Sequence, residues 1–146
     1  MRAGRGVHVP LTVEDAQARY PGAVSFTYGD SAELNAEILA LVRSGKKTAT
    51  CDAASAYGKG GDAWPEVGRR DVALNWDGTP AVMVETVEVS TRRFCDMDEA
   101  FVAAQGEFRD LAHWRAGYEA YFRRAGVFSE DMKLMCERFT LIEDYA

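Results

Sequence analysis

The chain has 146 residues, of which 47% are hydrophobic and 27% are charged, and its formal net charge is -6 at pH 7. This length and composition are typical of one globular domain that is large enough to bury a real core. The acidic balance argues against a broad positive surface that wraps a phosphate backbone, although a short basic rim around a pocket is compatible with it.

The cysteine and histidine content argues against a disulfide framework and against a metal site. Cys51, Cys95 and Cys136 are odd in number and scattered, so we expect free thiols in a reducing compartment. The two histidines, His8 and His113, form no cluster with cysteines at ligand spacing, so we expect neither a metal nor another cofactor. No apolar run is long enough to span a membrane and the N-terminus lacks a signal-peptide core, so we expect a cytoplasmic protein without a membrane partner.

Two helices are predicted in the first third of the chain. Thr12 is a suitable N-cap for a short helix over residues 12–20, with Asp15 in the position of a weak capping box. Ser31 is the expected N-cap of a second, stronger helix, and Gly45 is its expected stop. The apolar residues of this second helix recur at i, i+4, i+7 and i+8 and form one stripe. They are Leu34, Ile38, Leu41 and Val42.

The other elements follow from β-prone runs and helical patterns. Strands are predicted over residues 23–28, 48–52, 71–76, 80–90 and 132–142, and helices over residues 96–104 and 110–125. Asp77-Gly78 is a hairpin signal, whereas the glycine-rich loop of residues 57–68 contains no phosphate-binding motif. This order predicts one α+β domain, with a mainly antiparallel sheet that could curl into a small β-barrel.

The N-terminal residues are expected to form an appendage of this domain. Residues 1–10 are rich in Gly and Arg and should be loose. We therefore predict an N-terminal segment of residues 1–22, which contains the short helix and packs on a domain of residues 23–146.

The stretch Gly45-Lys46-Lys47-Thr48-Ala49-Thr50 is the strongest chemical signal. Lys47 and Thr50 would point to opposite faces of a straight strand, but a helix that bends into a strand could bring their amine and hydroxyl together. A threonine hydroxyl needs an adjacent base, and a lysine can be that base only if burial or another cation, such as Lys46, lowers its pKa. Taken alone, Lys-x-x-Thr is a common chance pattern.

In its context this stretch resembles the ASCH domain family, in the longer, stand-alone bacterial form. The resemblance spans residues 24–143 and depends on the order and spacing of several motifs. They are GKKTAT at 45–50, PEVG at 65–68, VMVETVEV at 82–89, residues 94–100, Trp114-Arg115, Tyr121-Phe122 and FSEDMKLMCERF at 128–139.

The resemblance implies a PUA-like β-barrel with flanking helices, and a cleft where the helix-to-strand motif meets the barrel mouth. Some bacterial members are metal-independent amidohydrolases that remove acyl groups from the exocyclic amine of cytidine nucleosides such as N4-acetylcytidine, with a Lys, a Thr and a Glu. The lysine corresponds to Lys47 and the threonine to Thr50. The carboxylate is less clear, because Gln105-Gly106-Glu107 stands where long-form members usually have Glu-Gly-Glu. We take Glu107 as the catalytic carboxylate, with the Gln105 position as the alternative.

Aromatic residues near the motif are candidates for stacking on a base. Tyr57 and Trp64 lie on the glycine-rich loop and could form a lid over a ligand. Trp114 and Tyr121 could also stack a base, but aromatics at helical spacing more often pack in a core. Tyr118 replaces a histidine that is frequent in long-form relatives.

Polar residues near the motif are weaker candidates. Asp52 and Ser55 could bind polar edges of a substrate, although such residues at the start of a loop are usually turn formers. Lys46 could reach the same pocket. Cys51 lacks an activating histidine, so a core role is favoured over a thiol nucleophile.

Three functions follow from these residues and the resemblance. The first is an amidohydrolase on a small modified nucleoside, with Thr50 as nucleophile or with Lys47 and Glu107 activating water. The second is an RNA-binding module or ribonuclease that uses the same cleft with a basic rim. The third is a binder without catalysis, as a consequence of the changes at Gln105 and Tyr118. A basic rim would need the Lys/Arg pairs to gather on folding. These pairs are 46–47, 69–70, 92–93 and 123–124.

Overall fold

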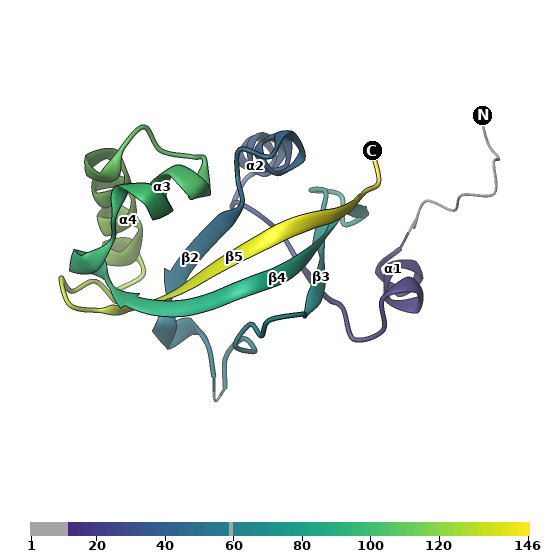
Figure 1. Ribbon diagram of the computed structural model, residues 1–146, viewed down its shortest axis with the longest axis horizontal. Helices are drawn as coiled ribbons and strands as arrows, with labels where there is room; N and C mark the ends of the chain where they lie inside the picture. The colour runs from purple at the N-terminus through teal and green to yellow at the C-terminus, as the bar shows by residue number, and fades with distance from the viewer. Residues whose placement is uncertain (1–11, 59) are drawn as a thin grey trace.

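The computed structural model describes residues 12–58 and 60–146, which form a five-stranded sheet with helices around it (Figure 1). The helices are α1 (Val13–Arg19), α2 (Ala32–Ser44), α3 (Glu99–Gln105) and α4 (Leu111–Arg124), with short 3-10 turns η2 (Ala54–Ala56) and η3 (Phe94–Asp96). The strands are β1 (Val24–Phe26), β2 (Ala49–Ala53), β3 (Arg70–Leu74), β4 (Pro80–Arg93) and β5 (Lys133–Asp144). The α+β class is confirmed.

The strand order is β1-β3-β4-β5-β2, so β1 and β2 are the two edges. Of the strand pairs in the described residues, only β1–β3 is parallel, which confirms the mainly antiparallel sheet. The register of β4 against β5 shifts between Met83 and Val84 and again between Thr86 and Glu88. Such irregularities bend a strand and increase its twist. The long β4–β5 ribbon therefore curls the sheet into a half-barrel, rather than the small barrel expected from the sequence.

Helices cover the sheet in three places. Helices α3 and α4 lie at one end, where Phe101 and Trp114 pack on β2 and β5 in the largest core cluster. Helix α2 buries Ile38 and Val42 against strands β3 and β4. Helix α1 lies at the opposite end of the sheet (Figure 1), where Ala16 contacts a small core cluster. The helices thus cover three different parts of the sheet.

The predicted N-caps of α1 and α2 and the predicted stop of α2 are confirmed. Thr12 and Asp15 form the capping box of α1, and the Ser31 hydroxyl accepts the Leu34 N–H at the start of α2. Gly45 ends α2 in the left-handed conformation, with a φ of 82°. The expected loose segment, residues 1–10, lies outside the described residues. The division into residues 1–22 and 23–146 stays a prediction.

Two predicted boundaries were wrong by three residues. The helix expected over residues 96–104 begins only at Glu99, because Asp98 caps it by accepting the Phe101 N–H and the preceding residues form the turn η3. The strand predicted over residues 80–90 continues to Arg93, since β4 remains paired with β5 up to that residue. Both errors lie at element ends, where the sequence pattern is weakest.

Gly106 is the glycine whose replacement we expect to damage the fold most directly. Its φ is +75°, and a Cβ placed on it would lie 2.6 Å from the backbone oxygen of Lys46. Gly45 has a similar φ of +82°, but a Cβ there would meet nothing within 4 Å. We expect Gly45→Ala to cost roughly 1 kcal/mol of unfolding free energy and Gly106→Ala roughly 3 kcal/mol, measured by urea unfolding. Equal costs for the two variants would contradict the close approach at Gly106.

Candidate functional site

A cleft of about 620 Å³ opens between the two edge strands of the sheet. Residues of β1 and β2 line it from either side, and side chains of the inner strands and of α4 form the rest of its wall. The cleft therefore lies on the concave side of the half-barrel, where a closed barrel would have joined its edges. Its volume is within the range of small-molecule sites.

Lys47 is buried at this cleft, with only 2% of its surface exposed. The backbone N–H groups of Lys46 and Lys47 both donate to the Leu41 oxygen, so the chain wraps around the end of α2 and turns Lys47 inward. Its Nζ donates to Glu107 Oε2 at 2.6 Å and to the Ala49 oxygen at 2.7 Å. A buried ammonium needs such partners, because an isolated charge in the interior is costly.

Thr50 lies on β2 and lines the same cleft. It pairs with Glu137 of β5, and in an antiparallel pair such opposite residues share one face. Within the part of the chain that the structure describes, the Thr50 hydroxyl makes no hydrogen bond, so it is free to contact a ligand. The three residues expected to be catalytic, Lys47, Thr50 and Glu107, are thus brought to one cleft.

Glu107, and not the side chain of Gln105, meets the lysine. Gln105 is fully buried and does not line the cleft, and its Oε1 lies 3.7 Å from Cys51 Sγ. The left-handed turn at Gly106 then reverses the chain and carries the Glu107 carboxylate to Lys47. Only the backbone oxygen of Gln105 faces the amine, at 3.4 Å.

Tyr118 and Cys51 form the floor of the cleft beside this pair. The Tyr118 ring stacks on Trp114 with centroids 5.1 Å apart, and its hydroxyl donates to the Cys51 backbone oxygen at 3.4 Å. Burial raises the pKa of the Tyr118 phenol well above its ordinary value. Burial also raises the pKa of the Cys51 thiol to about 12, which disfavours a thiolate nucleophile at this position.

Three of the expected substrate-binding residues line the cleft, namely Asp52, Tyr57 and Tyr121. Burial raises the pKa of the Asp52 carboxyl, whose Oδ1 accepts the N–H of Ala53. Tyr121 is 43% exposed at the rim of the cleft, so the packing role that helical spacing favours was wrong for this residue.

The other four expected binding residues do not line the cleft. Trp114 is fully buried and stacks on Phe94, which makes it a core residue and not a stacking platform. Trp64 packs edge to face on Tyr57 with centroids 5.5 Å apart and reaches the cleft only through that ring. Lys46 and Ser55 are exposed outside it. The expectation that Lys46 and Lys47 share one pocket was therefore wrong, because the end of α2 turns their side chains apart.

Among the cleft residues that the sequence reasoning missed are two acidic residues of the sheet, Asp71 and Glu137. Asp71 is 5% exposed and accepts hydrogen bonds from Arg69 at 2.8 Å and from the Val24 N–H at 3.2 Å. Glu137 accepts the hydroxyl of Thr86 at 2.5 Å, and burial raises the pKa of its carboxyl. The alternation of β5 was an available signal for Glu137, since a charged residue occupies the face that its neighbours two residues away fill with apolar side chains.

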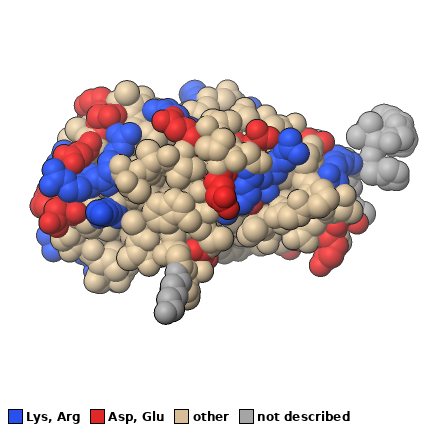
Figure 2. All heavy atoms as spheres, turned by 60° about the horizontal axis from the view of Figure 1, so that its bottom comes forward, with Lys and Arg blue, Asp and Glu red and all other residues tan. Residues whose placement is uncertain are grey.

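The arginine pairs do not gather into a basic rim. Arg70, Arg92, Arg93 and Arg123 each form an ion pair with a carboxylate away from the cleft. Acidic and basic side chains are accordingly intermixed on the face shown in Figure 2. The described arginines that line the cleft are Arg69 and Arg124.

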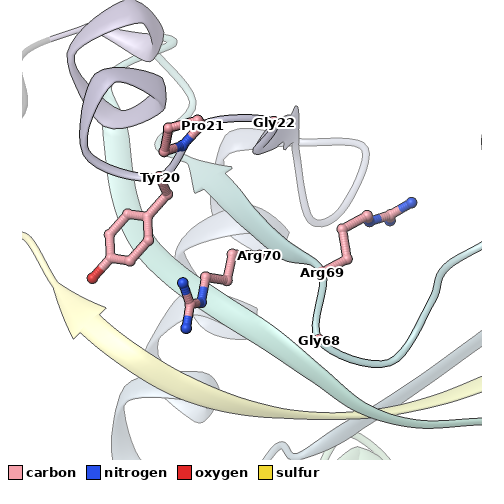
Figure 3. A pocket seen from close by; sticks show the side chains of 6 residues that line it. All are labelled: Tyr20, Pro21, Gly22, Gly68, Arg69 and Arg70. Carbon is pink, nitrogen blue, oxygen red and sulfur yellow. The ribbon is translucent and has the colours of Figure 1, made fainter.

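A second, smaller hollow of about 290 Å³ lies between the end of α1 and the start of β3. Figure 3 shows the side chains of Arg69 and Arg70 pointing in different directions, with Arg70 toward Tyr20. The Arg70 guanidinium lies 5.5 Å from the Tyr20 ring centroid and pairs with Glu85 at 2.9 Å. The residues around this hollow thus serve to pack the end of α1 against the sheet.

The curled, mainly antiparallel sheet with flanking helices and a cleft at its opening defines a protein of the PUA-like class. The family model described as "ASCH domain" matches residues 24–143, and the chain belongs to the ASCH domain family. This is a class of domains associated with RNA or nucleoside binding and with hydrolase-type or RNA-related activity.

Solved structures agree with this assignment. An ASCH domain from Lactobacillus crispatus is 27% identical, with a TM-score of 0.75 over 89% of this chain and 86% of that one. A protein from Enterococcus faecalis of the family DUF984 is 24% identical, with a TM-score of 0.80 over 91% of this chain and 86% of that one, and shows the same fold. No curated protein matches the chain. Among the described residues, no helix has the length and apolar character needed to cross a membrane.

We expect the Lys47–Glu107 pair to be a major determinant of stability. Glu107→Ala leaves the Lys47 amine buried without its carboxylate and should cost about 3 kcal/mol, the low end for breaking a buried pair, because Glu107 retains some contact with solvent. The double variant Lys47→Met/Glu107→Leu removes both charges and should be more stable than Glu107→Ala. Urea unfolding followed by tryptophan fluorescence measures both. An unchanged midpoint for Glu107→Ala would show that the pair does not hold the lysine in place.

Proposed function

We propose that the protein is an amidohydrolase that removes the acyl group from the exocyclic amine of N4-acylated cytidine or related modified nucleosides. The observation that carries this proposal is the buried Lys47–Glu107 pair in the same cleft as the uncommitted Thr50 hydroxyl. The cleft is large enough for one nucleoside, and membership of the ASCH domain family supports the substrate class.

The ion pair can act as a unit that accepts and returns one proton. In the first step Thr50 Oγ attacks the acyl carbon, its proton passes to the pair, and the Lys47 ammonium stabilises the developing oxyanion. Collapse of this intermediate breaks the bond to the exocyclic nitrogen, which leaves as the amine with the proton from the pair. Water then cleaves the acyl-threonine ester by the same proton transfers. In an alternative use of the same site, the pair activates water directly and Thr50 donates a hydrogen bond.

The wall of the cleft offers contacts for the rest of a nucleoside. The exposed ring of Tyr121 and the half-buried ring of Tyr57 provide aromatic faces for a base. Asp52 can accept hydrogen bonds from sugar hydroxyl groups. These contacts lie on α4, on the loop after β2 and on β2 itself, so three elements around the reacting groups would position the substrate.

The test is hydrolysis of N4-acetylcytidine by the purified protein, followed by the change in ultraviolet absorbance. We expect Lys47→Ala, Thr50→Ala and Glu107→Gln to lower kcat/KM by at least about 100-fold, because each removes a group that handles the proton or the oxyanion. Lys46→Ala, an exposed lysine outside the cleft, is the matched control and should keep the wild-type rate. Absence of wild-type turnover with acetyl, propionyl and benzoyl substrates would refute the amidohydrolase proposal.

RNA is the second candidate ligand, because Arg69 and Arg124 both line the cleft. If they contact two phosphates of a single strand, log K for binding should fall with log[salt] with a slope of about -1.4. Fluorescence anisotropy of a labelled oligonucleotide measures this slope when the salt concentration is varied about sixfold, from roughly 50 to 300 mM. Binding with this slope, in a protein without turnover of nucleosides, would favour the RNA-binding function.

A further inference from the structure

The Glu137 carboxyl lies in the cleft beside the proposed nucleophile without being part of the Lys47–Glu107 pair. Glu137 is directly opposite Thr50 in the β2–β5 register, so the two side chains emerge on the same face with Cβ atoms about 5 Å apart. Met135 and Phe139, two residues away on either side, line the cleft as well. A base held with its acylated amine at Thr50 would therefore have Glu137 along its edge.

One oxygen of this carboxyl is fixed and the other is available. Oε2 accepts the hydroxyl of the buried Thr86 at 2.5 Å, which sets the orientation of the group. Across residues 12–58 and 60–146, Oε1 has no hydrogen-bond partner and Glu137 forms no ion pair. Asp71, the other deeply placed acid of the cleft, is already engaged by Arg69 and by the Val24 N–H. Of Asp71 and Glu137, Glu137 is thus the acid with an oxygen left for a ligand.

The environment of Glu137 makes ionisation of its carboxyl less favourable than in water. Burial is the largest effect and raises the pKa of the carboxyl, and Asp71 raises it further. The Thr86 hydrogen bond and the positive charges of Arg69 and Lys47 oppose this effect without reversing it. Glu137 in turn raises the pKa of the phenols of Tyr28 and Tyr57.

A neutral carboxyl group presents an O–H donor and a C=O acceptor side by side. With the proton on Oε1, Oε2 is the acceptor, and its second lone pair can meet a ligand while the first accepts the Thr86 hydroxyl. The Watson–Crick edge of cytosine presents the complementary pair, an acceptor at N3 and a donor at N4, and an amine that carries one acyl group still keeps one hydrogen. Uracil presents the reverse pair, with a donor at N3 and an acceptor at O4. A fixed donor–acceptor pair at this position therefore discriminates between the two bases.

We propose that Glu137 is the specificity-determining residue of the cleft and that its carboxyl group recognises the N3 and N4–H edge of cytosine-type bases. This inference rests on the proposed function of the cleft, because it assumes that a nucleoside base enters with its exocyclic amine near Thr50. It adds a base-recognition role to a residue outside the Lys47, Thr50 and Glu107 set.

The test is equilibrium binding of cytidine and uridine, measured by isothermal titration calorimetry. Wild type should bind cytidine roughly tenfold or more tightly than uridine, the order of discrimination given by a bidentate contact to a base edge. Glu137→Ala should lose this preference. Glu137→Gln should keep it, because a carboxamide also places a donor beside an acceptor. Glu88→Ala, an exposed carboxylate on the neighbouring strand, is the control and should behave as wild type.

The pH profile separates recognition from a structural role. The carboxyl donates only while it is protonated, so the cytidine preference of wild type should decline as pH rises through the pKa of Glu137. The preference of Glu137→Gln should stay flat over the same pH range, because a carboxamide does not titrate. A cytidine preference that survives in Glu137→Ala, a Glu137→Gln profile that follows wild type, or a wild type without preference would each overturn the inference. Binding of cytidine and uridine requires no hydrolysis. The calorimetry therefore tests base recognition alone, and the turnover assay with N4-acetylcytidine tests the amidohydrolase proposal.

Discussion

The buried amine of Lys47 is the constraint on which the rest of the site depends. An ammonium in the interior is tolerated only where fixed oxygens surround it, and those oxygens come from three separate places: Ala49 in β2, the backbone of Gln105 at the end of α3, and the carboxylate of Glu107. Two left-handed glycines, Gly45 and Gly106, make this convergence possible. The geometry of the site therefore depends more on the turns that position the partners of Lys47 than on the lysine motif itself.

The sequence predicted the local parts of this arrangement well, because they depend on short-range chemistry. The caps at Thr12 and Ser31 and the stop at Gly45 are encoded within a few residues of each helix end. The partnership of Lys47 with Glu107 spans sixty positions and depends on the turn at Gly106, so a sequence pattern could only nominate it. The helical period likewise revealed an aromatic stripe on α4 without showing which members face the core and which face the cleft.

The curled sheet provides the other wall of the site by remaining open. Strands β1 and β2 end the sheet without joining, and unpaired strand edges normally invite association with other chains. Here the gap between them holds the cleft, and inward-facing charged residues such as Asp71 and Glu137 occupy its interior. Charges on the concave face of a sheet oppose both closure of the barrel and dry packing of another strand, which keeps the opening accessible to a small polar ligand.

The backbone hydrogen bond from Thr48 to the Ala104 oxygen, at 2.8 Å, ties the start of β2 to the end of α3. Together with the close approach of Gly106 to the Lys46 backbone, it fastens the two segments that carry the lysine and the carboxylate to each other. The backbone on this side of the cleft is therefore tightly constrained and should tolerate few substitutions. Divergence among relatives with different ligands should concentrate on the opposite wall, in β1 and in the loop of residues 57–68, where side chains can be exchanged without disturbing the buried pair.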